Sequence, residues 1–220
     1  MCGRYTLTKP AKTIQSHFAF MEPKVSHKKR YNIAPTQQAP VVMLREGKRE
    51  LLLMRWGLIP PWSKDEKMGS RMINARAETI QEKPSFKNSF KTKRCLVPAD
   101  GFIEWENTEG GKQPHYITLQ NNALFAFAGI WSEWKKDDGL LWTFSIITTD
   151  CNSLVQPIHH RMPVILYPEN YNTWLNVSSE AKALQSLLTS FPADQMERIA
   201  ISREINSAKN DRAECLRPPA

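Results

Sequence analysis

The sequence lacks the long apolar runs that cross membranes. No stretch approaches the roughly 20 consecutive apolar residues that a membrane helix needs. The N-terminal segment MCGRYTLTKPAKTIQ also lacks the apolar segment of about 7–15 residues that marks a secretory signal peptide. These absences argue against a membrane or secreted protein, and we expect a soluble cytoplasmic one.

Cysteine pairs and metal-binding clusters are missing as well. The cysteines, Cys2, Cys95, Cys151 and Cys215, are far apart, with no C-x-x-C pair and no Cys/His group at zinc spacing. In a reducing cytoplasm we expect free thiols, and we expect no metal and no other cofactor. Cys95 and Cys151 lie in apolar, strand-like contexts and are expected in the core.

The sequence contains enough apolar material for one folded domain. Its 220 residues, of which 41% are hydrophobic, suit a single domain spanning 1–220. The formal net charge of +8 fits a polyanionic partner. A basic surface that is simply solvated explains the charge equally well.

Short strand-like runs dominate the chain, and repeats or low-complexity tracts are absent. Runs rich in β-branched and aromatic residues predict strands at 41–46, 50–59, 94–106, 114–119, 124–134, 140–149, 163–167 and 197–202. The stretch 107–112 predicts a hairpin turn. Fewer segments predict helices, at 9–18, 168–175 and 178–188, the last with serines able to cap its start. We expect an α+β fold that is mainly β, with a few peripheral helices.

Cys2 stands out by its position, because initiator methionine is usually removed before a small residue. Removal of Met1 leaves a free α-amine beside the Cys2 thiol. Their reference pKa values are about 8 and about 8.5, so both are expected to be partly nucleophilic near neutral pH. An aldehyde forms an imine with such an amine, and the thiol then closes a thiazolidine ring. Alternatively, Cys2 is an early residue of a frayed terminus.

Two further stretches place polar side chains where a core does not need them. In 71–80, Asn74 and Arg76 alternate with alanines, which fits either a polar-faced strand or a site with an amide and a phosphate-binding guanidinium. Glu104 lies between Ile103 and Trp105. Burial against apolar neighbours raises the pKa of a carboxyl and suits a general acid, although a solvent-facing strand position explains it too.

A histidine pair and two proline-containing loops complete the candidate residues. His159, His160 and Arg161 directly precede an apolar strand, and histidine is the usual proton shuttle near neutral pH. The loops at 30–37 and 54–65 hold Trp56, expected in the core, and Trp62, expected to be exposed. An exposed tryptophan can stack on an unpaired base.

Taken in order, these motifs resemble one family. MCGR, YNIAPTQ, RWGLIPPW, INARAET, CLVPADGFIEW, FAFAGIW, ITT, HHRMPVIL and SREINSAKND follow the pattern of the SOS-response-associated peptidase (SRAP) family, from Cys2 to about residue 218. Members are also called abasic-site processing proteins. The resemblance implies a mainly β, barrel-like fold and single-stranded DNA with abasic sites as the partner. It also implies a thiazolidine crosslink that shields the lesion during the DNA damage response.

The resemblance also implies roles for individual residues. Cys2 matches the nucleophile, Asn74 the residue that positions the sugar, Glu104 the acid and base, and His159, rather than His160, the group that hydrogen-bonds the opened sugar. The positions that match DNA contacts are Arg4, Asn32, Pro35, Trp62, Arg76 and Arg161. We expect a monomer that acts on damaged DNA at the nucleoid, with covalent chemistry like that of a lyase. We also expect the protein to remove its own Met1.

Two other readings remain open. A thiol peptidase could use Cys2 with His159 and Glu104 as nucleophile, base and acid, in the narrowest case only to remove Met1. A noncovalent single-strand-binding module would use the basic residues and leave Cys2 without a role.

Overall fold

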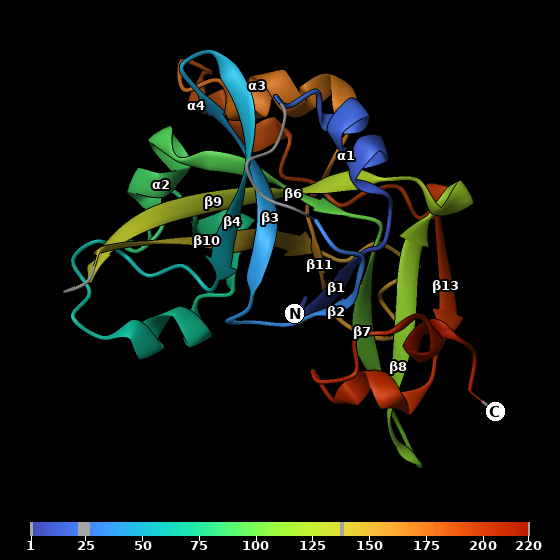
Figure 1. The fold of residues 1–220 in the computed structure, drawn as a ribbon. Helices are drawn as coiled ribbons and strands as arrows, with labels where there is room; N and C mark the ends of the chain where they lie inside the picture. The colour runs from blue at the N-terminus through green and yellow to red at the C-terminus, as the bar shows by residue number, and fades with distance from the viewer. Residues whose placement is uncertain (1, 22–26, 137–138, 220) are drawn as a thin grey trace.

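The computed structural model of the chain describes residues 2–21, 27–136 and 139–219. β-strands dominate it, and short helices lie at the periphery (Figure 1), as the sequence predicts. Across these ranges no helix is long and apolar enough to cross a membrane. The boundary of one domain at 1–220 stays a prediction.

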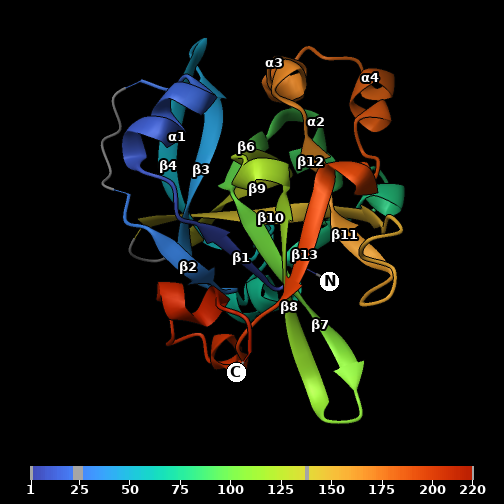
Figure 2. The ribbon, with the colours of Figure 1, turned by 90° about the vertical axis from the view of Figure 1, so that its right-hand side faces the viewer.

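One antiparallel sheet has the strand order β13-β8-β7-β1-β2 (Figure 2). Its strands are β1 (Arg4–Leu7), β2 (Arg30–Ile33), β7 (Gly101–Thr108), β8 (Gly111–Leu119) and β13 (Met196–Ala200). The N-terminal strand β1 therefore lies between two others and is held on both edges. β7 and β8 form the hairpin expected around 107–112, with Thr108 opposite Gly111.

The second sheet closes on itself. Its strands are β3 (Gln38–Arg45), β4 (Lys48–Trp56), β5 (Asn74–Arg76), β6 (Arg94–Ala99), β9 (Phe125–Lys136), β10 (Gly139–Asp150), β11 (Arg161–Pro163) and β12 (Ile165–Leu166). β10 pairs with both β4 and β9, so the series β10-β4-β3-β6-β9 returns to β10. This ring is the barrel-like core that the resemblance implies.

The helices are short. The α-helices are α1 (Ala11–Phe18), α2 (Lys87–Thr92), α3 (Tyr171–Leu175) and α4 (Ala181–Ser186). The 3-10 segments are η1 (Glu66–Arg71), η2 (Ala77–Thr79), η3 (Gln120–Asn122), η4 (Pro168–Asn170), η5 (Ala193–Gln195), η6 (Arg203–Asn206) and η7 (Ala213–Leu216). The serine cap expected for 178–188 is wrong: Glu180 occupies the cap position of α4 without a side-chain hydrogen bond, and the Ser179 hydroxyl donates instead to the carbonyl of Thr173.

The predicted strand at 94–106 is two strands that belong to different sheets. The chain turns at Asp100, whose carboxylate accepts hydrogen bonds from the Thr6 hydroxyl and from the backbone N–H groups of Thr8 and Lys9. These contacts tie the turn to the end of β1. β7 thus leaves the barrel and runs beside β1, which places Glu104 near the N-terminus.

A continuous core fills the space between the sheets. Tyr5 on β1 makes edge-on contacts with Trp56 and Phe127, at centroid distances of 5.2 and 5.8 Å. Trp56 and Cys95 are fully buried, as predicted. Cys151 is only half-buried and packs against the rim of this core, so its assignment to the core interior is wrong.

Candidate functional site

Cys2 is held in place immediately before β1. Its side chain is fully buried, and its thiol lies 3.8 Å from the carbonyl of Arg4. Asn74 on β5 donates a hydrogen bond from Nδ2 to the carbonyl of Cys2 at 2.9 Å. The frayed-terminus alternative is therefore wrong, and the structure brings Asn74 to Cys2 from the other sheet.

The environment of Cys2 suppresses ionisation of its thiol. Burial, followed by the negative charge of Glu104, raises the pKa of the thiol well above its usual range. The thiol therefore stays protonated at neutral pH. This corrects the expectation drawn from the reference pKa, and it means that a base must remove the thiol proton as sulfur forms a bond.

Glu104 is the buried acid of the site. It lies on β7, is 3% exposed, and has its pKa raised because burial penalises the carboxylate. The solvent-facing alternative is therefore wrong. Glu104 shares a pocket of about 530 Å³ with His159, and the other lining residues are Trp105, Asn107, Lys112, Ile158 and Asn206.

His159 enters this pocket from the loop between β10 and β11. The backbone N–H of Arg161 donates to its Nδ1 at 2.9 Å. Burial, with the positive charges of its neighbours His160 and Arg161, lowers the pKa of the imidazole, so the neutral ring dominates at pH 7. His160 stacks on His159 at a centroid distance of 4.5 Å and does not line the pocket.

The guanidinium of Arg161 forms its hydrogen bonds with groups of the protein itself. Its guanidinium forms a two-point contact with Glu78 at 2.8 and 2.9 Å, and it also donates to Asp150 and to the carbonyl of Thr148. The residue is 6% exposed. Its charge is already matched and its position fixes the backbone beside His159, so the predicted phosphate contact would have to compete with these partners.

Arg4 and Asn32 bind the segment 201–217 rather than facing an open path. Arg4 donates to the Asn32 side chain and to the carbonyls of Ile205 and Asn206. Asn32 is fully buried, and its amide donates to carbonyls of the same segment. The predicted DNA contact of Asn32 would have to compete with these bonds. Arg4 is half-buried, and its phosphate contact stays a prediction.

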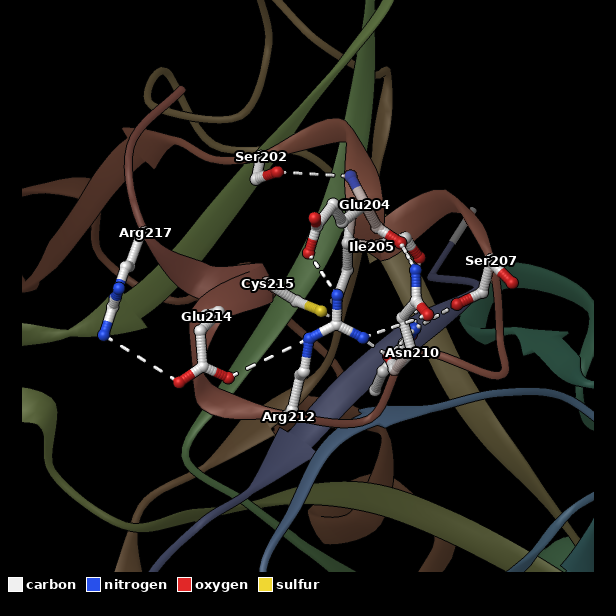
Figure 3. Close-up of polar contacts among 10 residues, drawn as sticks. Ser202, Glu204, Ile205, Ser207, Asn210, Arg212, Glu214, Cys215 and Arg217 are labelled. Atoms are coloured by element: carbon white, nitrogen blue, oxygen red, sulfur yellow. Dashed lines mark hydrogen bonds and ion pairs between the residues drawn. The ribbon is translucent and has the colours of Figure 1, made fainter. Parts of the chain in front are cut away.

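The segment 201–217 is braced by its own polar contacts (Figure 3). Arg212 bonds Glu204 at 2.7 Å and lies 4.0 Å from Glu214, and Asn210 donates to the carbonyl of Glu204. Cys215 is buried beneath them with Ile205. The bracing supports Asn206, whose side-chain oxygen accepts from the indole N–H of Trp105 at 2.7 Å in the pocket wall.

The remaining predicted DNA contacts lie nearer the surface. Trp62 is 59% exposed, as predicted, in the loop after β4. Arg76 is exposed and lies two residues after Asn74 on β5, so the two share a face of the strand. Pro35 is half-buried in the turn between β2 and β3. Contact of these residues with DNA remains a prediction.

Several residues of the pocket were not predicted from the sequence. Trp105, Asn107, Lys112 and Asn206 line it without having been assigned a role. Asn206 lies within the stretch SREINSAKND, so its motif was recognised but its side chain was not. The buried His115, opposite Glu104 on β8, was also missed.

Comparisons with known proteins show the family of the chain. The model of the SOS response associated peptidase (SRAP) family matches residues 1–208. The chain is 45% identical to abasic site processing protein YoaM of Bacillus subtilis, over 98% of this chain and 97% of the relative. It is 35% identical to abasic site processing protein HMCES of Gallus gallus, over 86% of this chain and 66% of the relative.

A solved structure supports the fold independently. A crystal structure of a protein from Bacteroides thetaiotaomicron superposes with a TM-score of 0.91 at 31% identity, and the match covers 100% of both chains. The chain belongs to the SOS response associated peptidase family and is similar over nearly its whole length to abasic site processing proteins.

Proposed function

We propose that this protein recognises abasic sites in single-stranded DNA and crosslinks to them covalently in the DNA damage response. Once Met1, which lies outside the described residues, has been removed, Cys2 offers an α-amine and a thiol to the aldehyde of the ring-opened sugar. The product is a thiazolidine. Relatives that are named abasic site processing proteins support this substrate class.

The observation that carries the proposal is that Cys2, Glu104 and His159 lie close together. Glu104 on β7 and His159 in the loop between β10 and β11 line one pocket although they come from distant parts of the chain. β1 pairs with β7 so that Arg4 lies opposite Ile103, which brings the residues just before Arg4 alongside Glu104. A nucleophile, an acid and a neutral imidazole at one place suit aldehyde chemistry better than a structural core.

The reaction balances without a cofactor. The amine adds to the aldehyde carbon, and the aldehyde oxygen leaves as water with both amine hydrogens. Sulfur then adds to the imine carbon, and the thiol proton ends on the ring nitrogen. Glu104 in its protonated form delivers the proton to the leaving oxygen, and as a carboxylate it accepts the proton that the neutral thiol must lose.

The remaining residues of the site orient the reactants. Asn74 holds the carbonyl of Cys2, so the amine and thiol are presented in one geometry. With Nδ1 occupied as an acceptor, a neutral His159 carries its proton on Nε2, which makes it a donor to an oxygen of the opened sugar.

DNA binding rests on charge and stacking rather than on base reading. Arg76 supplies an exposed guanidinium for phosphate, and the net charge of +8 favours a polyanion. Trp62 offers an exposed ring for a base beside the lesion, with Pro35 stiffening a neighbouring loop. An abasic site has no base, so contacts of this kind tolerate any flanking sequence.

The decisive experiment is intact-mass spectrometry of the protein before and after mixing with a single-stranded oligonucleotide that contains one abasic site. We expect a protein lacking Met1 and a stable adduct that maps to Cys2. Cys2→Ser should bind the same DNA without forming the adduct. Cys151→Ser, which removes another half-buried thiol, is the matched protein control. An oligonucleotide whose abasic sugar has been reduced to the alcohol is the matched DNA control.

The alternatives give different results in the same experiment. A noncovalent module would bind abasic and intact strands alike, with no adduct in the processed protein. A general thiol peptidase would cleave peptides without DNA. Self-removal of Met1 would be supported if Glu104→Gln retained that residue while the unchanged protein lost it. We expect one protein per adduct from a monomer, measured by light scattering.

A further inference from the structure

A lysine lines the pocket without a part in the chemistry proposed above. Lys112 follows Gly111 at the start of β8, is exposed, and shares the pocket with Glu104 and His159. Within the ranges that the structure describes, no carboxylate forms an ion pair with Lys112 and no acceptor takes a hydrogen bond from its amine. The charge of Lys112 is therefore available to a ligand.

Lys112 is also the one cation among the described residues that line this pocket. The imidazole of His159 is neutral at pH 7, because burial and the positive charges beside it lower its pKa. Burial favours the protonated form of Glu104. The other lining residues, Trp105, Asn107, Ile158 and Asn206, carry no charge. An anionic group that enters the pocket therefore has one oppositely charged partner there.

Asn107 supplies a second donor beside this amine. It lies on β7 as the direct cross-strand partner of Lys112, which places their Cβ atoms about 4.5–5.5 Å apart. Asn107 is exposed and lines the same pocket. An ammonium and an amide N–H group side by side suit the oxygens of a phosphate, which accept charge-assisted hydrogen bonds.

The carboxylates of the same hairpin do not cancel the charge of Lys112. Glu106 is bonded to His115 at 2.8 Å, and Glu109 is exposed in the turn. Neither of them is among the described residues that line the pocket. A phosphate beside Lys112 and Asn107 therefore meets donors rather than a negative charge.

The pocket lies along an edge of β7 that β1 leaves open. β1 pairs with β7 only as far as Arg4 opposite Ile103, and β8 occupies the other edge of β7. Cys2 lies where the open edge begins. Asn107 is three residues beyond Glu104, which corresponds to about 10 Å along the strand. A substrate that spans this edge has its reacting carbon at one end and its anionic group several bonds away.

A ring-opened abasic sugar has this form. Its aldehyde is C1, its 5′-phosphate is attached at the opposite end of the carbon chain, and its 3′-phosphate is attached midway. When the aldehyde lies at Cys2, the 5′-phosphate is the group far enough away to meet Lys112 and Asn107.

We propose that Lys112 and Asn107 form a phosphate subsite that binds the 5′-phosphate of the ring-opened sugar while its aldehyde meets Cys2. This inference rests on the proposed function and defines its substrate more closely. A deoxyribose aldehyde that carries a 5-phosphate is preferred to the bare sugar, both within a DNA strand and as a free molecule. The subsite makes and breaks no covalent bond, and it acts by holding the aldehyde in position.

The test compares 2-deoxyribose 5-phosphate with 2-deoxyribose as free substrates of the processed protein. Intact-mass spectrometry measures the rate of adduct formation at Cys2. Because the phosphate also changes the amount of open aldehyde in solution, each rate is divided by the rate of the same sugar with free cysteine. We expect a corrected preference of about 10-fold for the phosphorylated sugar, the size of one charge-assisted hydrogen bond. Added inorganic phosphate should reduce this preference.

Variants at exposed positions assign the preference to the subsite. With Lys112→Gln, the two sugars should react at nearly equal corrected rates, whereas Lys112→Arg should keep most of the preference. Asn107→Asp should lower it, because a carboxylate repels the phosphate. Lys48→Gln, which removes an exposed lysine beside the turn between β3 and β4, is the matched control and should keep the full preference. The melting temperatures of these variants confirm that each is folded.

The same comparison is made in DNA with a strand whose 5′-terminal residue is the abasic site, with or without its 5′-phosphate. The phosphate is then the only difference between the two substrates. This pair of strands decides the question if the free sugars react too slowly to be measured. Lys112→Gln should remove the advantage of the phosphorylated strand.

The outcomes separate the two proposals. Equal corrected rates with and without the phosphate, or a preference that Lys112→Gln retains, overturn the subsite and leave the proposed function standing. An adduct that maps to Lys112 after borohydride reduction also overturns the subsite, because the amine then reacts with the aldehyde instead of binding the phosphate. If the unchanged, processed protein forms no adduct with an abasic strand, both proposals fall.

Discussion

The backbone N–H of Arg161 donates a hydrogen bond to Nδ1 of His159 at 2.9 Å. A nitrogen that accepts a backbone hydrogen bond cannot carry a proton in the neutral ring. The proton therefore sits on Nε2, and His159 acts as a donor rather than as a base. Because the guanidinium of Arg161 is bound to Glu78 and Asp150, the peptide that makes this contact is itself held in place.

The two adjacent histidines should differ sharply when substituted. His159→Ala removes a donor from the pocket, and we expect crosslinking to slow by about 10- to 100-fold, in the range of one lost polar contact in a transition state. His160→Ala removes only a stacked ring and should stay within about 2-fold. Single-turnover rates on the abasic oligonucleotide measure both, and a larger effect at His160 would show that the roles had been exchanged.

Glu104→Gln should separate chemistry from binding. The amide keeps the shape of the side chain but can neither give nor take a proton, so we expect crosslinking to slow by about 10²- to 10⁴-fold. Affinity for a non-reactive strand should change little, because Glu104 is buried and carries no positive charge for phosphate. Rates that match the unchanged protein would remove Glu104 from the mechanism.

The same substitution should change how stability depends on pH. Burial raises the pKa of Glu104 in the folded protein above its unfolded value, near 4.3. The folded state therefore holds the proton more tightly, and stability is lost as pH rises from the unfolded pKa through the raised folded one. Glu104→Gln should abolish this loss and be more stable than the unchanged protein at pH 8. Urea unfolding at pH 4 and pH 8 tests it, with Glu109→Gln in the exposed hairpin turn as control.

Two arginines that the family pattern treats alike should behave differently. Arg76→Ala removes an exposed charge, so DNA affinity should fall and the slope of log K against log salt should decrease by about 1. Arg161→Ala instead breaks a buried network whose carboxylates are exposed, and should cost about 1–3 kcal/mol of stability. Salt titrations of DNA binding measure the loss of phosphate contacts in both variants, and thermal unfolding measures the loss of stability. Equal salt slopes for the two variants would show that Arg161 contacts phosphate as well.

Trp62→Ala tests stacking next to the lesion. The side chain is 59% exposed, so its loss should change stability by no more than about 0.5 kcal/mol. Affinity for single-stranded DNA should fall by about 1–3 kcal/mol if the ring stacks on a base. Fluorescence titration measures the loss, and Leu140→Ala, another exposed apolar residue, serves as control. Equal affinities for both variants would exclude a stacking role.

The sequence predicted the fold class because strand periodicity and turn residues are local signals. It could not show that the run 94–106 breaks at Asp100, because the partners of that carboxylate, Thr6 and Thr8, are distant in sequence. The motifs identified Cys2, Asn74, Glu104 and His159, and the structure brings Asn74 to Cys2 and His159 to Glu104. The contacts of this site with DNA stay predictions.

Burial changes properties of the site residues that cannot be predicted from the sequence alone. The reference pKa of cysteine suggested a partly ionised thiol, whereas the packing around Cys2 keeps it neutral. Asn32 and Arg161 look like surface contacts in a linear motif, and only tertiary structure shows that their polar atoms are engaged inside. His115 required the hairpin register, which follows once the two-residue turn at Glu109 and Gly110 is located.

The hydrogen bond from the Arg4 guanidinium to the carbonyl of Ile205 joins residues that are far apart in the sequence and are therefore synthesised at different times. Chains with many such distant contacts fold slowly, because the intervening loop must close first. During synthesis, the cysteine near the N-terminus emerges long before Asn206 can complete the pocket wall. The pocket that holds Glu104 and His159 is therefore complete only after residue 206 has been synthesised and folded back against it.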